Sequence, residues 1–219
     1  MNRPALHVLA AAMLAVLLVG YGGRVLAQDP SLCTVEVYGD SIMASNGSDE
    51  TPVATLQRIR PNLWVLADHS VPGMPLHTVA TYFPYLTIAA HFVIIENGVI
   101  DAWQAENINT VMYDYTSIVR RVRDEGRIPV LTGFSHQVPG TLSSYNLWLR
   151  DFYDTVIRAV AMNANVAFAD WDSVPFYGAV DLIDTVHPNR EYSHRLIGRL
   201  AQTLDSIAPG CTAILVPPG

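Results

Sequence analysis

The stretch Val35–Gly47, VEVYGDSIMASNG, decides the fold. An apolar, strand-like run ends abruptly at Gly39, Asp40 and Ser41, and small and polar residues follow it. A strand that stops here and turns into a helix leaves the Ser41 hydroxyl at the carboxyl edge of a sheet, where open α/β folds bind their ligands. The stretch therefore predicts an α/β fold with a candidate nucleophile at the end of its first strand.

Further apolar runs bounded by turn residues follow along the chain, with room for a helix between neighbours, which is typical of a parallel sheet. The expected strands are Val35–Tyr38, Leu63–Ala67, His91–Glu96, Ile128–Thr132 and Val166–Ala169. The expected helices are Thr51–Ile59, His77–Leu86, Asn107–Glu125, Leu142–Met162 and Asn189–Ile207. This alternation predicts one domain with a three-layer α/β/α sandwich, a five-stranded parallel sheet and right-handed crossovers.

The first residues have the pattern of a targeting segment. Arg3 supplies a positive charge, and the apolar run ALHVLAAAMLAVLLVG that follows is short and poorly flanked for a membrane span. Small residues near Ala27 suit cleavage, so we expect a secretory signal peptide over residues 1–27 and a mature domain over residues 28–219. The alternative is an uncleaved membrane anchor. Either way we expect export to the periplasm or the extracellular space, with no stable membrane insertion after cleavage.

The composition excludes several kinds of site. The formal net charge is −7, and all 13 basic residues are arginine. A chain without lysine cannot form a Lys Schiff base, a pyridoxal phosphate site or a P-loop. The acidic balance also argues against nucleic acid as a partner. The histidines and acids lack a metal-binding spacing, so we expect neither a metal nor a cofactor.

Cys33 and Cys211 lie at the two ends of the mature domain. In an oxidising compartment we expect them to pair. The alternative is a cysteine nucleophile, although neither thiol has a motif around it.

The segment DTVHPN carries the second half of the predicted chemistry. Asp184 stands three residues before His187, Pro188 follows, and a helix is expected from Asn189. A serine hydrolase needs a base for the serine proton and a carboxylate that holds this base in the right tautomer. Asp-x-x-His supplies both groups from one turn, and proline stiffens the backbone behind the imidazole, in a place that suits the first position of a helix.

Taken together, these segments resemble the SGNH hydrolases, also called GDSL-type esterases and lipases. The resemblance runs from YGDSIMASNG to DTVHPNREYSHRLIGRL and implies the flavodoxin-like fold of that family. It implies that Ser41 is the nucleophile, His187 the general base and Asp184 its orienting partner. It also implies that Gly73, in VPGMP, joins its backbone N–H to that of Ser41 in an oxyanion hole.

One block departs from the family pattern. Where the family has Gly-x-Asn-Asp, this chain has Gly98-Val99-Ile100-Asp101, and isoleucine donates no hydrogen bond. Either the enzyme relies on two backbone donors, or Asn97 moves its amide into the oxyanion hole. Asparagine at a strand end is also a common turn residue.

Each motif alone has a simpler interpretation. Gly-Asp-Ser is a common turn, and Asp-x-x-His can be a helix cap followed by a surface histidine. GFSHQ, at Gly133–Gln137, resembles a nucleophile elbow only in part, because its last position is Gln137. The two catalytic motifs in the right order nevertheless favour catalysis.

The predicted activity is hydrolysis of carboxylic esters through an acyl-enzyme on Ser41. The loops after the strands are short, which favours short-chain acyl or acetyl esters on a small molecule, a lipid or a glycan. The alternative is an exported carbohydrate- or lipid-binding module with little catalysis. The sequence gives neither the natural substrate nor the oligomeric state.

Overall fold

Five parallel strands form the central sheet, in the order β2-β1-β3-β4-β5. The strands are β1 (Thr34–Tyr38), β2 (Trp64–Asp68), β3 (Phe92–Ile95), β4 (Ile128–Thr132) and β5 (Ala167–Ala169). The structure, a computed structural model, describes residues 30–212, and the predicted signal peptide lies outside them. The strand order is that of flavodoxin-like sheets, whose ligands lie at the carboxyl ends of the strands.

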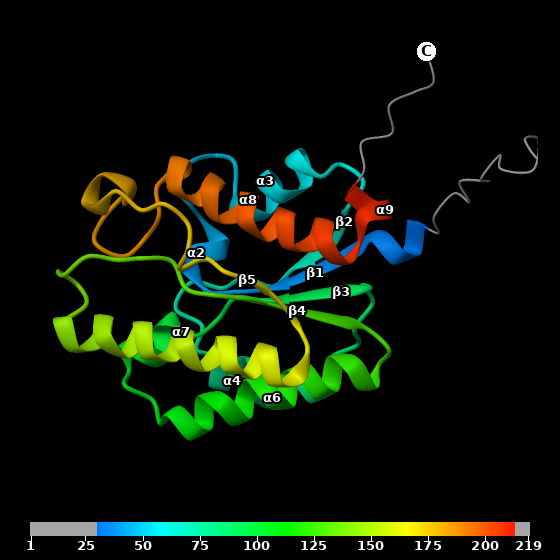
Figure 1. Cartoon of the computed structure of the whole chain (residues 1–219), viewed down its shortest axis with the longest axis horizontal. Coiled ribbons are helices and arrows are strands. Elements are labelled where there is room, and N and C mark those ends of the chain that lie inside the picture. The colour runs from blue at the N-terminus through cyan, green and yellow to red at the C-terminus, as the bar shows by residue number, and fades with distance from the viewer. Residues whose placement is uncertain (1–29, 213–219) are drawn as a thin grey trace, which may run out of the picture.

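Helices cover both faces of this sheet, which confirms the predicted three-layer α/β/α sandwich (Figure 1). One layer holds α3 (Pro52–Ile59) and α8 (Arg190–Ile207), and the other holds α4 (Leu76–Tyr82), α6 (Ile108–Asp124) and α7 (Ser144–Ala164). Shorter elements are α2 (Ser41–Ala44), α5 (Val99–Trp103), α9 (Pro209–Thr212) and the 3₁₀ turns η1 (Pro30–Cys33), η2 (Phe83–Tyr85) and η3 (Gly178–Asp181). Among the described residues, no helix is long and apolar enough to cross a bilayer.

The side chains of the central strands alternate between two hydrophobic cores. Val35 and Val37 belong to the core under α3 and α8. Val93 and Ile95 belong to the core under α4, α6 and α7. Because both faces are covered, β3 is apolar in every position, and β1 carries Glu36 as its one buried charged residue. The edge strand β2 is less enclosed, and Trp64 remains 60% exposed.

Side-chain caps set the helix boundaries and explain how they differ from the predicted ones. The helix expected at Leu142–Met162 begins at Ser144, because Ser143 and Asn146 form a capping box there. The helix expected at His77–Leu86 ends at Tyr82 and continues as the 3₁₀ turn η2. Pro84 lies in this turn and lacks the N–H that an α-helix needs.

Helix α5 lies in a segment that the sequence analysis treats as a loop. It has only five residues, VIDAW, too few for an apolar period to show. It follows β3 directly and therefore determines where Ile100 and Asp101 lie. Ile100, which stands where the family has an asparagine, is thus a buried residue of this short helix.

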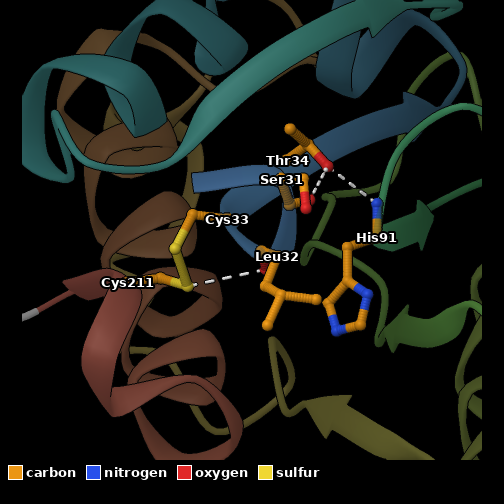
Figure 2. The surroundings of a disulfide bond; sticks show 6 residues. All are labelled: Ser31, Leu32, Cys33, Thr34, His91 and Cys211. Carbon is orange, nitrogen blue, oxygen red and sulfur yellow. Dashed lines mark hydrogen bonds between the residues drawn. A yellow bond between two sulfur atoms is a disulfide. The ribbon is translucent and has the colours of Figure 1, made fainter. Parts of the chain in front are cut away.

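A disulfide joins Cys33 to Cys211, as predicted, with a Cα–Cα distance of 5.3 Å. Figure 2 shows it linking the start of the first strand to the end of the described chain. Beside it, the Thr34 hydroxyl donates to the carbonyl of Ser31 and accepts the backbone N–H of His91. These bonds fix the amino-terminal end of β1 to the sheet and to the last helices.

Candidate active site

Ser41 lies at the tight turn where β1 passes into α2. Strand β1 ends at Tyr38 and α2 begins at Ser41 itself. Asp40 is the N-cap, and its carboxylate accepts the N–H of Ile42 at 2.9 Å. The Asp40 N–H donates to Glu96 at the end of β3, at 3.0 Å. Two hydrogen bonds, one local and one from the neighbouring strand, therefore fix the backbone that presents the Ser41 hydroxyl.

His187 lies in a narrow loop that is closed by backbone hydrogen bonds. The Ile183 N–H donates to the carbonyl of His187 at 2.9 Å, and the Asn189 N–H donates to that of Asp181 at 2.8 Å. Asn189 is the N-cap of α8 and Pro188 precedes it. The sequence-based expectation that this proline suits the first helical position is therefore wrong, because the cap lies between the proline and the helix. The proline still ends a stiff loop that carries the imidazole.

The structure brings three of the predicted residues together. The Nε2 atom of His187 lies 2.9 Å from the Ser41 hydroxyl oxygen, and its Nδ1 atom lies 2.8 Å from the Asp184 carboxylate. The other carboxylate oxygen of Asp184 accepts the N–H groups of Val186 and His187 at 2.7 and 2.8 Å. A base that is hydrogen-bonded to a hydroxyl and oriented by a carboxylate can activate that hydroxyl as a nucleophile.

The charge of Asp184 suits an orienting role. Partial burial raises the pKa of Asp184, but hydrogen bonds from His187 and Val186 outweigh this effect and lower its pKa to about 2. The carboxylate is therefore ionised at neutral pH and favours a proton on Nδ1 of His187. Nε2 is then free to accept the proton of Ser41.

Gly73 lies in a tight turn beside the loop that carries Ser41. The Met74 N–H donates to the carbonyl of Val71 at 3.0 Å, with Pro72 and Gly73 between them. Gly73 has φ +76°, so the four residues have the features of a type II turn, which favours glycine at its third position. The Val71 N–H also donates to the carbonyl of Gly39 at 3.0 Å, which ties this turn to the loop that carries Ser41.

A pocket of about 290 Å³ opens at Ser41 and His187. Three loops surround it, namely the segment after α2, the turn at Pro72 and the loop before His187. Its lining residues are Ser41, Ser45, Gly47, Pro72, Ile183, Asp184 and His187. The pocket therefore gives a small ligand access to the hydroxyl and the imidazole.

Residues 37–194 match the model of the GDSL-like lipase/acylhydrolase family, and this range contains Ser41, Asp184 and His187. The chain belongs to this family. It is accordingly a carboxylic ester hydrolase, as the sequence analysis predicts. A sequence search of curated proteins gives no match.

Solved structures of GDSL-like and other esterases share the fold. The crystal structure of TesA has a TM-score of 0.67 at 24% identity, over 80% of this chain and 99% of that one. The psychrotrophic esterase EstA from Pseudoalteromonas sp. has a TM-score of 0.67 at 16% identity, over 81% and 99%. A catalytic mutant of Axe2, an acetylxylan esterase from Geobacillus stearothermophilus, has a TM-score of 0.63 at 17% identity, over 78% and 93%. At these identities the likeness confirms the fold of this acylhydrolase.

Asn97 of this GDSL-like chain does not line the pocket. Its side chain is 0% exposed, and its Nδ2 donates to the carbonyl of Met74 at 3.1 Å. In this conformation the amide holds the residue that follows Gly73. Direct donation to an oxyanion, which the sequence analysis considers, would require the amide to leave Met74 and reach the pocket.

Asp101 fixes the start of the helix that follows the Gly73 turn, a role that its sequence context did not predict. Its carboxylate accepts the N–H of Leu76 at 2.8 Å and that of His77 at 3.4 Å. These are the first two residues of α4. The N-cap of this helix is Pro75, whose side chain makes no capping hydrogen bond. Asp101 therefore caps α4 in its place. The sequence could have indicated this role only indirectly, because no residue directly before Leu76 has a side chain that could cap the helix.

Two buried carboxyl groups, those of Asp40 and Glu96, lie beside the turn that carries Ser41. Burial raises the pKa of Asp40 to about 7. Burial and then the neighbouring Asp40 charge raise the pKa of Glu96 well above its ordinary value. Because Glu96 accepts the Asp40 N–H, this pair supports the turn at Ser41 from inside the fold.

The GFSHQ segment and the histidines of α4 and α8 do not line the pocket. Ser135 of the GFSHQ segment is fully buried, and His136 lies 2.9 Å from the carbonyl of Asp172. His77 and His194 pair with Asp114 and Glu50, respectively. Within residues 30–212, no cluster of histidine, cysteine or acidic side chains has the arrangement of a metal site.

Proposed function

We propose that this chain is an exported serine esterase in which Ser41, His187 and Asp184 form a catalytic triad. The observation that carries the proposal is the pair of hydrogen bonds, at 2.9 and 2.8 Å, that links the Ser41 hydroxyl through the imidazole to the carboxylate. The first of these joins residues 146 positions apart in the chain. A contact of this kind has no local structural reason, whereas a hydrolase requires it.

In the proposed reaction, His187 takes the proton of Ser41 while the hydroxyl oxygen attacks the ester carbonyl. The tetrahedral intermediate collapses, the bond to the alcohol breaks, and His187 gives its proton to the departing alcohol. Water then attacks the acyl-enzyme with His187 again as base, and the carboxylic acid leaves with Ser41 restored. The backbone N–H groups of Ser41 and Gly73 stabilise the oxyanion, and each lowers the activation barrier by about 2.7–4 kcal/mol. This reaction uses no metal and no cofactor.

We assign Asn97 a positioning role in the oxyanion hole. Its bond to Met74, and the bonds of Asp101 to the start of α4, restrain the chain directly after Gly73. Ile100 contributes no donor, so in this proposal the two backbone N–H groups are the oxyanion donors.

Substrates of this reaction are esters with short acyl groups, acetyl included. The support is the small pocket of about 290 Å³ and the similarity in fold to Axe2, an acetylxylan esterase. The chain is proposed to act on small-molecule, lipid or glycan esters after removal of residues 1–27. A mass of the secreted protein that corresponds to a start at Gln28 would support this maturation, and retention of residues 1–27 would contradict it.

The second candidate function is an exported carbohydrate- or lipid-binding module that has kept the fold with little catalysis. Ile100 motivates it, because the family asparagine that would donate to the oxyanion is absent. A fluorophosphonate, which labels only an activated serine, separates the two functions.

The decisive experiment replaces Ser41 with alanine and compares it with Ser206→Ala, an exposed serine near the end of α8. We expect wild type and Ser206→Ala to hydrolyse p-nitrophenyl acetate and to be labelled by the fluorophosphonate. Ser41→Ala should do neither while its circular dichroism spectrum is unchanged. Full activity in Ser41→Ala would rule out this nucleophile. Binding of esters by a wild-type protein that is never labelled would favour the binding module.

A further inference from the structure

The pocket at Ser41 has one apolar wall, formed by Gly47, Pro72 and Ile183. A Cβ atom added to Gly47 would lie 2.5 Å from the Cδ1 atom of Ile183, so the isoleucine side chain lies directly on the Gly47 backbone. Ile183 is nevertheless 54% exposed, because its other side faces the open pocket. An apolar group bound beside the nucleophile would cover this exposed surface.

The same pocket offers little to a sugar or a charged group. None of its lining residues is a phenylalanine, a tyrosine or a tryptophan, and none is a lysine or an arginine. Apart from Ser41, Asp184 and His187, its only polar side chain is that of Ser45, which already accepts the N–H of Gly47 at 3.3 Å. Polar ligands lose hydrogen bonds to water when they enter a site that cannot replace them. An alkyl chain loses none, and it gains by leaving water.

The size of the pocket limits the chain that it can hold. A volume of about 290 Å³ corresponds to roughly ten water molecules at liquid density. It is at the lower end of the range for small-ligand sites. A short alkyl chain fits beside the ester group, whereas the far end of a long fatty chain would remain in solvent.

We propose that Ile183 is a specificity-determining residue that contacts the acyl chain of the substrate, and that the preferred substrates are esters of short apolar acids, of about four to six carbons. This inference rests on the proposed function of Ser41 and His187. A buried methylene group gains about fourfold in binding. The value of kcat/KM is therefore expected to rise from acetate to hexanoate by about this factor for each methylene in contact with Ile183. Because the contact exists before and during the reaction, the gain appears mainly in KM.

The test measures kcat and KM for p-nitrophenyl acetate, butyrate, hexanoate and octanoate with wild type, Ile183→Ala and Ile183→Ser. Either change removes the apolar contact but keeps the backbone N–H that closes the loop to His187. We expect a 4- to 20-fold loss of kcat/KM on hexanoate, mainly through KM, and less than a twofold loss on acetate. The matched control is Val180→Ala, since Val180 is 74% exposed and does not line the pocket. It should leave the whole series unchanged.

A second series of alkyl acetates varies the alcohol while the acyl group stays constant. The assignment of Ile183 to the acyl chain is overturned if Ile183→Ala changes kcat/KM only in this alcohol series. It is also overturned if the variant lowers kcat/KM equally for p-nitrophenyl acetate and p-nitrophenyl hexanoate. Failure of the proposed function is distinct, because the wild type would then neither hydrolyse acetate nor react with a fluorophosphonate. A labelled, active enzyme that prefers acetylated sugars over p-nitrophenyl hexanoate would overturn the inference and leave the catalytic proposal intact.

Discussion

Substitution of Gly73 by alanine tests directly whether its turn contributes to an oxyanion hole, as we propose. Gly73 has φ +76°, and a Cβ atom added there meets nothing within 4 Å. The change therefore introduces no clash, and only the backbone conformation opposes it. A residue other than glycine in the left-handed region costs about 1–2 kcal/mol.

The turn can avoid this cost by changing its type. A type I turn needs no positive φ at its third position, and it differs from type II by rotation of the peptide between Pro72 and Gly73. That peptide carries the N–H that we assign to the oxyanion hole. A cost of 1–2 kcal/mol shifts the balance between the two turns by about 5- to 30-fold. Complete loss of one donor would reduce kcat by about 10²- to 10³-fold.

We therefore expect Gly73→Ala to lower kcat by as much as about 5- to 30-fold, which is less than the loss of a whole donor would give, with little change in KM. The matched control is Gly126→Ala. Gly126 has φ +70°, also has nothing within 4 Å of an added Cβ, and lies in the turn between α6 and β4. Both variants should lose similar stability, about 2–8 °C in Tm. Steady-state kinetics with p-nitrophenyl acetate and thermal melts measure both effects. If Gly73→Ala keeps kcat within twofold of Gly126→Ala, the role of this turn in catalysis is refuted.

Three further predictions concern the imidazole, the buried acids and the disulfide. Asp184→Asn should lower kcat by up to about 10⁴-fold, because an amide favours the tautomer of His187 that cannot accept the serine proton; activity near wild type would argue against an orienting role. Burial raises the pKa of Asp40 to about 7 and raises that of Glu96, so both groups destabilise the fold as pH rises from about 4 through 7. Glu96→Gln should therefore reduce the fall in Tm between pH 5 and pH 8, and an unchanged fall would contradict this. Replacing both disulfide cysteines, 178 positions apart, with serine should cost up to about 5 kcal/mol, or roughly 10–20 °C in Tm; a change under about 2 °C would show that the cross-link contributes little.

Most of the fold was predictable because its signals are short-range. Apolar runs that are buried on both faces of a sheet indicate the strands, and β4 was predicted with its observed ends, Ile128–Thr132. The helix boundaries were less accurate, because side-chain caps such as Ser143 and breaks such as that at Tyr82 set them. Helix α5 was missed because five residues are too few to show a period.

The candidate site likewise combines local features, which the sequence predicts, with contacts between distant segments, which it does not. The sequence by itself determined the strand-to-helix turn at Ser41 and the placing of Asp184 three residues before His187, because turn chemistry and hydrogen bonds over three residues depend on neighbouring positions only.

Only the tertiary structure decided the contacts between distant segments. It brought His187 to within 2.9 Å of Ser41, turned the Asn97 amide to the carbonyl of Met74 and laid Ile183 on the backbone of Gly47. Each of these contacts depends on how layers and loops far apart in the chain pack around one sheet. Local propensity carries no information about that packing, because many arrangements satisfy the same short-range pattern.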